Sequence, residues 1–130
     1  MANQNMISDA EWVLMQVLWA QPPLSAQEVY NAVSEKVDWH PKTVRTLLGR
    51  LVDKKAVHRE KRDGTFRFAP IVSESACVRE EGDSFLHRCF SGKAMPMLAH
   101  FIEHESLAPD DIAALRAMLD RKLAEERKHE

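Results

Sequence analysis

The sequence predicts a mainly α-helical protein in which a winged helix-turn-helix domain at residues 1–71 is followed by a helical dimerisation domain at residues 72–130. Two observations lead to this fold class. Three helical segments and a two-stranded hairpin follow one another in the first half of the chain, which is the element order of a winged helix. The second half contains three amphipathic helical segments whose apolar sides need a partner.

Two capping boxes mark the starts of the first two helices. Ser8 and Glu11 stand three residues apart, as do Ser25 and Glu28. Each serine hydroxyl can accept from a backbone amide while the glutamate reaches back to the serine amide. A pair of prolines ends the first helix, and we expect the second to cover residues 26–36. Apolar residues at helical spacing predict a shared core: Trp12, Met15, Leu18, Trp19, Val29, Tyr30 and Val33.

The third helix is expected over residues 41–54, with Pro41 at its first position, where the missing N–H costs no hydrogen bond. An apolar stripe from Val44 to Val52 faces the core. The opposite side carries long donors, short hydroxyls and Gly49, a combination that suits the base edges of a DNA major groove. The residues expected to read bases are Lys42, Thr43, Thr46 and Arg50.

The dipeptide Asp63-Gly64 between two alternating segments predicts a tight hairpin, because such a turn needs positive φ angles. This hairpin, the wing, covers residues 57–69. We expect Phe66 and Phe68 to pack in the wing core rather than to stack on bases. Phosphate contacts are expected from the other basic residues of the helix and the wing: Arg45, Lys54, Lys55, Arg59, Lys61, Arg62 and Arg67.

The charge distribution supports this interpretation. The chain has 18 Lys and Arg against 20 Asp and Glu, and a net charge of -2 gives no sign of a polyanionic partner. Residues 36–67, however, contain ten basic and four acidic side chains, a local charge of +6, whereas the segments on either side each carry -4. A solvated basic surface is the alternative explanation. The three helices followed by a wing favour nucleic acid.

The second half of the chain predicts a dimerisation unit. Ser73 can cap a helix that reaches about Phe90, a shorter helix surrounds Phe101, and Pro109 starts a third. Three such helices cannot readily enclose a core, so we expect a homodimer in which each chain covers the apolar sides of the other. The expected interface residues are Phe85, Leu86, Cys89, Leu98, Phe101, Ile102, Ile112, Leu115 and Leu119.

Other chemical motifs are weak. His100, Glu103 and His104 fit the H-x-x-E-H pattern of some zinc hydrolases, but catalysis needs a third ligand and a cleft that a short helical segment does not provide. Cys77 and Cys89 lie about 120° apart around one helix and cannot pair with each other, so we expect both to pack. We predict no enzyme activity, no cofactor and no metal. We also expect no membrane segment, no export signal and a cytoplasmic protein.

Two blocks of sequence carry a family resemblance. Residues 7–12 read Ile-Ser-Asp-Ala-Glu-Trp, and residues 38–51 include Pro-Lys-Thr-Val-Arg-Thr-Leu. The chain resembles the penicillinase-repressor and methicillin-resistance-repressor family (BlaI and MecI) over nearly its whole length. The resemblance implies a cytoplasmic homodimeric repressor that binds a palindromic DNA operator in front of β-lactamase or related resistance genes.

The resemblance also implies how repression ends. In that family a membrane sensor detects β-lactam, and the repressor is then cut in its dimerisation region between Asn and Phe. The matching bond here is His100-Phe101, which keeps the aromatic residue but not the asparagine. A sensor-linked protease is therefore an expected partner. Two alternatives remain: a winged-helix module that binds protein, and the zinc hydrolase based on His100, Glu103 and His104.

Overall fold

The computed structural model describes residues 7–129. Residues 1–6 and 130, which the expected domains include, lie outside the described residues. The chain divides into two compact units, residues 1–80 and 81–130. The division falls inside a helix, whereas the expected boundary between domains was residue 71/72. Each unit is considered by itself.

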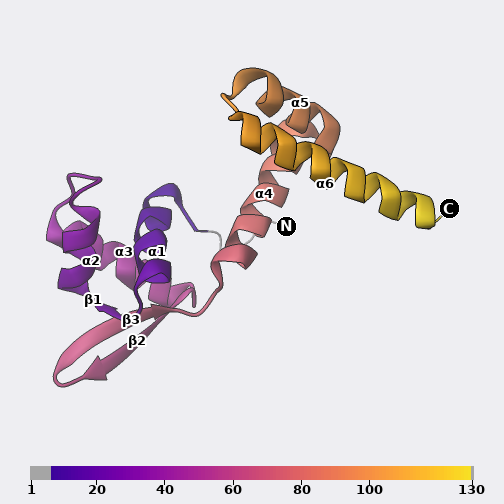
Figure 1. The fold of residues 1–130 in the computed structure, drawn as a ribbon. Coiled ribbons are helices and arrows are strands. Elements are labelled where there is room, and N and C mark those ends of the chain that lie inside the picture. The colour runs from indigo at the N-terminus through magenta and orange to yellow at the C-terminus, as the bar shows by residue number, and fades with distance from the viewer. Residues whose placement is uncertain (1–6, 130) are drawn as a thin grey trace. The chain divides into compact units, whose positions relative to one another are not determined.

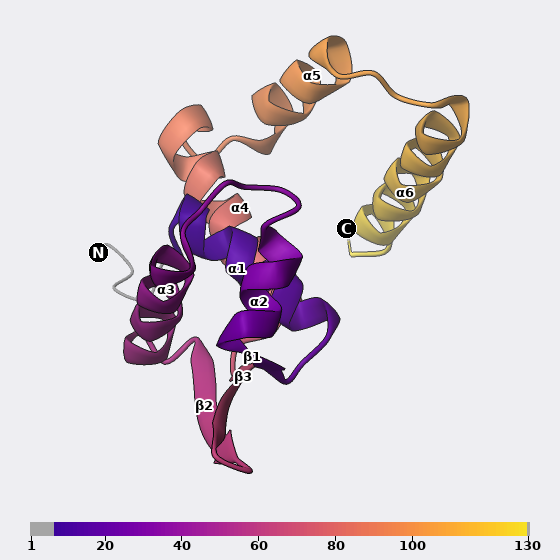
Figure 2. The ribbon, with the colours of Figure 1, turned by 90° about the vertical axis from the view of Figure 1, so that its left-hand side faces the viewer.

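Besides the first turns of a fourth helix, the described part of the first unit contains three helices and a small sheet (Figures 1 and 2). Its elements in order are α1 (Asp9–Ala20), β1 (Leu24–Ser25), α2 (Ala26–Val33), α3 (Pro41–Asp53), β2 (Val57–Arg62) and β3 (Thr65–Pro70). The strands form an antiparallel sheet in the order β1-β3-β2. Both views show the β2–β3 hairpin extending away from the helices, and this arrangement confirms the winged helix.

Both capping boxes are present. The Ser8 hydroxyl accepts from the amide of Glu11 at 3.2 Å, and the Glu11 carboxylate accepts from the amide of Ser8 at 2.8 Å. Ser25 and Glu28 repeat these two bonds at the start of α2. Helix α2 ends at Val33 rather than at residue 36, because the next three residues form a turn. Strand β1, with only two residues, gave no signal in the sequence.

The core of the first unit lies where the three helices meet the sheet. Trp12 and Trp19 are half-buried at its edge, with their rings 5.5 Å apart edge to face. The indole N–H of Trp19 donates to the carbonyl of Val72 at 3.0 Å. The buried apolar residues are Ile7, Leu14, Met15, Leu18, Val29, Val33, Val44, Leu47, Leu48, Leu51, Ala56, Val57 and Phe68.

The wing forms as expected, with one correction. Asp63 and Gly64 have φ angles of 52° and 81°, which fit a two-residue hairpin turn. Phe68 is buried, but Phe66 is 44% exposed, so the expectation that both would pack in a core is wrong for Phe66. Strand β1 pairs with Phe68 and Arg67 of β3, and Phe66 lies beyond that pairing, nearer the turn.

After β3, the described residues form three helices: α4 (Glu74–Phe90), α5 (Ala94–His104) and α6 (Pro109–Lys128). The Ser73 hydroxyl accepts from the amide of Ala76 at the start of α4. Ser91 and Gly92, both with positive φ, end that helix. None of the three helices has a buried residue. No helix in the described part of the chain combines the length and apolarity needed to cross a bilayer.

Candidate nucleic-acid interface

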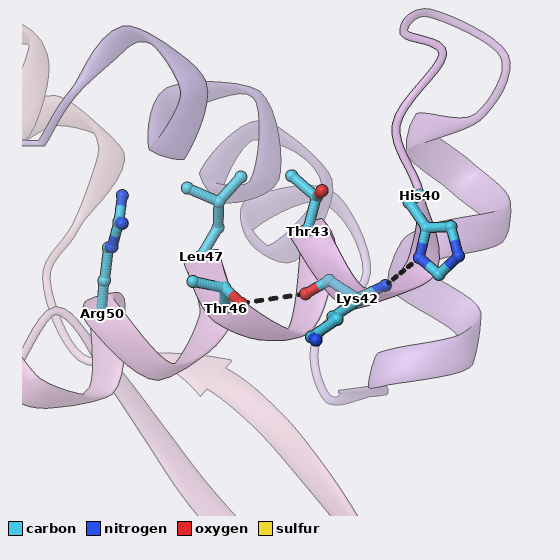
Figure 3. Close-up of a pocket in the computed structure, with 6 residues that line it drawn as sticks. All are labelled: His40, Lys42, Thr43, Thr46, Leu47 and Arg50. Carbon is cyan, nitrogen blue, oxygen red and sulfur yellow. Dashed lines mark hydrogen bonds between the residues drawn. The ribbon is translucent and has the colours of Figure 1, made fainter.

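The exposed face of α3 contains a shallow hollow of about 460 Å³ (Figure 3). All four residues expected to read bases are exposed there, and all come from one helix. We call this surface the recognition face; the residues that line it are His40, Lys42, Thr43, Thr46, Leu47 and Arg50. A rigid helix therefore presents two cations and two hydroxyls together, which is the donor and acceptor set that DNA base edges and phosphates require.

His40 belongs to this face and was missed from the sequence. Its ring caps α3: Nδ1 accepts from the amide of Lys42 at 3.0 Å (Figure 3). A nitrogen that accepts carries no proton, so the neutral ring bears its hydrogen on Nε2 and can donate outward. Histidine is not among the preferred cap residues, which is why only Pro41 signalled the start of the helix.

Thr46 has its hydroxyl orientation set by the helix. Its Oγ1 donates to the carbonyl of Lys42 at 3.0 Å, one turn earlier (Figure 3). The hydroxyl hydrogen is therefore used, and the oxygen lone pairs and the methyl group remain for a ligand. In this state Thr46 offers an acceptor and an apolar contact rather than a donor.

A second hollow of about 480 Å³ lies between α3, the start of α2 and the wing. Arg45 and Gly49 contribute from α3, and Arg59 and Phe66 contribute from the wing. We call it the wing–helix hollow. A Cβ added to Gly49 would have no atom within 4 Å, so the protein itself has no steric need for glycine there. Two guanidinium groups from separate elements make this hollow a candidate for backbone phosphates.

The structure separates the seven residues expected to contact phosphates. Three of them have carboxylate partners within the chain: Lys54 with Glu11, Arg62 with Glu60 at 3.1 Å, and Arg67 with Glu28 at 3.0 Å. Arg59 and Lys61 instead lie over the ring of Phe66. Within residues 7–129 no carboxylate pairs with Arg45, Lys55, Arg59 or Lys61. The sequence could not reveal the partners of Lys54 and Arg67, because those carboxylates lie on other elements. Glu60 and Arg62, in contrast, are two residues apart on one strand and so share a face.

Glu11 and Lys54 form a partly buried ion pair between the start of α1 and the end of α3. The side chain of Glu11 is only 1% exposed. Burial by itself raises the pKa of this carboxyl, but the hydrogen bonds from Lys54 and Ser8 outweigh that effect and hold the pKa below its ordinary value. Lys54 therefore fixes the end of α3, a role that the sequence did not suggest.

The remaining sequence motifs lie on α4 and α5. The rings of His100 and His104 lie 4.7 Å apart on α5. In the part of the chain that the structure describes, no three His, Cys, Asp or Glu side chains are placed to hold one metal ion. Burial, with a smaller effect from the charge of Glu80, raises the pKa of the Cys77 thiol, as suits a packing cysteine. Cys89 is exposed in the single chain.

Three helices with a wing, and an exposed basic face on the third helix, define a winged-helix transcriptional regulator of the DNA-binding class. Residues 7–121 match the family described as the penicillinase repressor, and the chain belongs to this family.

The relatives agree with this assignment. The chain is 33% identical to the methicillin resistance regulatory protein MecI of Staphylococcus aureus over 116 residues, which cover 89% of this chain and 94% of MecI. It is also 33% identical to the penicillinase repressor of Bacillus licheniformis over 114 residues, 88% of this chain and 89% of that protein. The first of these relatives is named a regulatory protein and the second a repressor. Membership of the penicillinase-repressor family places this chain among transcriptional repressors rather than enzymes.

A solved structure resembles the first unit. The solution structure of the DNA-binding domain of the repressor BlaI matches with a TM-score of 0.51 and 36% identity. The match covers 58% of this chain and 92% of that domain. The winged helix is thus shared with a domain that is itself described as DNA-binding.

Proposed function

We propose that this protein is a homodimeric repressor that binds a palindromic operator in duplex DNA and controls β-lactamase or related resistance genes. The observation that carries the proposal is the recognition face, where Lys42, Thr43, Thr46 and Arg50 lie together on α3. In a helix-turn-helix protein the second helix of the motif enters the major groove, and here that helix is α3. Duplex DNA is the partner that suits this surface, and we place the protein in the cytoplasm with it.

The proposed roles follow the chemistry of each side chain. Lys42 and Arg50 donate to guanine acceptors, and the free Nε2–H of His40 adds a third donor at the start of the helix. Thr46 contacts a thymine methyl or accepts from a base amino group, because its own hydrogen is used within the helix. Arg45, Lys55, Arg59 and Lys61 contact phosphates.

The helices of the second unit support the homodimer. Large apolar side chains remain exposed on α5 and α6, among them Ile102 at 53% and Leu119 at 57%. Monomeric proteins rarely leave so much apolar surface in one region, and a second copy is the partner that matches a symmetric operator. A hollow of about 400 Å³ in this unit offers a seat for the partner's side chains; its apolar lining is Ile102, Leu107, Ile112, Leu115 and Leu119.

We further propose that cleavage at His100-Phe101 by a sensor-linked protease ends repression. Both residues lie inside α5 rather than in a loop. A protease binds an extended segment, so cleavage requires the end of α5 to open locally first. The N-terminal sequence of the fragments recovered after exposure of cells to β-lactam tests this step, and fragments beginning at another residue would reject this bond as the site.

The experiment that tests DNA binding compares a duplex selected by the protein from a random library with an unselected duplex. We expect the affinity for the selected duplex to fall by roughly 10³ or more between 50 and 200 mM salt if six or more phosphates are contacted. Lys42→Ala and Arg50→Ala should reduce the preference for the selected duplex, whereas Lys61→Ala should weaken both duplexes equally. Failure to select any duplex would favour the protein-binding module instead.

A further inference from the structure

One face of the wing carries its two cations beside aromatic rings. Residues paired directly across an antiparallel ladder lie on the same face of the sheet. The register pairs Arg59 with Phe68 and Lys61 with Phe66, so these four residues share a face. Phe68 is buried in the core, and Arg59, Phe66 and Phe68 line the wing–helix hollow. This inner face of the wing is therefore turned toward α3.

The outer face of the wing has its cations neutralised. Glu60 pairs with Arg67 across the ladder, and the Glu60 carboxylate accepts from Nε of Arg62 at 3.1 Å. Arg67 donates to the carboxylate of Glu28 on α2 at 3.0 Å. Each arginine of this face therefore has a carboxylate beside it, so the outer face has little net positive charge with which to attract a phosphate. The outer face is thus a poor source of DNA affinity.

The ring of Phe66 contacts both cations of the inner face. The guanidinium carbon of Arg59 lies 4.5 Å from the centre of the ring, and the ammonium nitrogen of Lys61 lies 5.6 Å from it. Both distances are within the range of cation–π attraction. Because the ring is 44% exposed, its contribution to the core is small, yet it restricts two long side chains that would otherwise sample many rotamers. Both cations keep their charge available for a ligand.

The wing–helix hollow brings a further cation to the same place. Arg45 approaches from α3, and Arg59 approaches from the wing. The glycine at position 49 leaves open space on the α3 side of this hollow. Because the cations come from two elements, they can contact successive phosphates of one extended nucleic-acid strand. A single compact anion suits this arrangement less well.

Building on the DNA-binding function proposed above, we propose that Phe66 is a positioning residue that holds Arg59 and Lys61 for the operator backbone. The wing–helix hollow then receives a stretch of the sugar–phosphate chain beside the major groove. Arg62 and Arg67, although equally charged, take little part. The wing therefore increases DNA affinity through its inner face alone.

The test measures how the binding constant of the selected duplex varies with salt for the full-length protein. Phe66→Ala removes no charge, yet we expect it to weaken binding roughly three- to tenfold and to lower the salt slope by about one to two, as if phosphate contacts were lost. Phe66→Tyr keeps the ring and should restore both values. In the free protein, the Arg59 Nε–Hε resonance should shift in Phe66→Ala and remain in place in Phe66→Tyr.

Matched controls come from the two faces of the wing. Arg59→Gln should lower the salt slope by about one, whereas Arg62→Gln and Arg67→Gln should change affinity by less than about threefold. Two results would overturn the role of Phe66. One is an equal loss of DNA affinity from substitutions on both faces of the wing. The other is a salt slope in Phe66→Ala that equals the slope of a salt-dependent parent protein. Loss of salt dependence in the parent protein would instead contradict the DNA-binding function itself.

Discussion

Glu11 shows how a single side chain connects local and long-range structure. Its carboxylate closes the capping box with Ser8 and also pairs with Lys54, which is 43 positions away in the sequence. Glu11 thus fixes the start of α1 and the end of α3 together. Because α3 carries the recognition face, the ion pair also determines how firmly that face is held.

The pH dependence of stability follows from this carboxyl. A group with a lowered pKa in the folded state contributes stability above its ordinary pKa of 4.5 and loses that contribution as the pH falls through the lowered value. We expect the free energy of unfolding, measured by urea denaturation, to decrease below about pH 5. In Glu11→Gln the capping box survives but the ion pair is lost.

That variant should be less stable at pH 7 by about 1–3 kcal/mol, with a flatter acid limb. Glu35→Gln alters an exposed carboxyl and serves as the control, since it should follow the parent curve. A parent and a Glu11→Gln variant with parallel acid limbs would show that another carboxyl governs acid unfolding.

At the scale of the element, α3 has a different cap at each end and a glycine in its interior. His40 caps its start. At its end, Lys55 adopts a φ of 63° while its amide and that of Ala56 bond to the carbonyls of Val52 and Leu51, each at 3.0 Å. This left-handed ending commonly uses glycine. Glycine stands instead at position 49 inside the helix, where nothing in the protein requires it.

Gly49→Ala is therefore expected to separate stability from function. Alanine in a helix interior stabilises by about 0.5–1 kcal/mol relative to glycine, which should raise the thermal midpoint by a few degrees. The added methyl group lines the wing–helix hollow and should weaken DNA binding by about tenfold if the backbone of the operator lies there.

Gly82→Ala is the matched control for this substitution. Gly82 also lies inside a helix, α4, and an added Cβ also meets no atom within 4 Å. It should stabilise the protein to a similar extent without weakening DNA binding. Tighter or unchanged binding by Gly49→Ala in an electrophoretic mobility assay would place the DNA elsewhere on α3.

The features that could be predicted from the sequence are those that depend on local interactions. The capping boxes, the Asp63-Gly64 turn and the stripe on α3 depend on residues near one another, and each was predictable. The two-residue β1, the shortened α2, the cap at His40 and the exposure of Phe66 were not. The cap at His40 is local, but histidine is not among the residues that commonly cap a helix. The pairing of β1 and the exposure of Phe66 depend on which element covers another, and periodicity contains no such information. The carboxylate partners of Lys54 and Arg67 belong to the same group.

At the scale of the whole molecule, the two units differ in how their apolar surface is used. The first unit encloses a core among three helices and a sheet, whereas α5, α6 and the part of α4 that belongs to the second unit leave every residue at least partly accessible. The positive charge of residues 36–67 is confined to the first unit, and the chain outside that segment is acidic. A second unit with acidic charge and apolar stripes suits contact with another copy rather than with DNA.

Leu119→Asp tests this division of labour. Leu119 is 57% exposed and shares the stripe of α6 with Ile112 and Leu115. In a symmetric dimer each substitution is made twice, so two unpaired carboxylates would be buried, and we expect dimerisation to weaken by about 100-fold or more. Sedimentation equilibrium measures this change. Binding to a full palindrome should weaken accordingly, while binding to a half-site should be unchanged.

Ala117→Asp provides the control for this last variant. Ala117 is exposed and lies on the opposite side of α6 from the stripe, about 140° from Ile112 around the helix. It adds the same charge without entering the interface, so it should remain a dimer with parent-like operator binding. If the parent itself sediments as a monomer at micromolar concentration, the exposed stripe serves another partner, and each winged helix binds its half-site alone. If both variants dimerise normally, the interface excludes the stripe of α6.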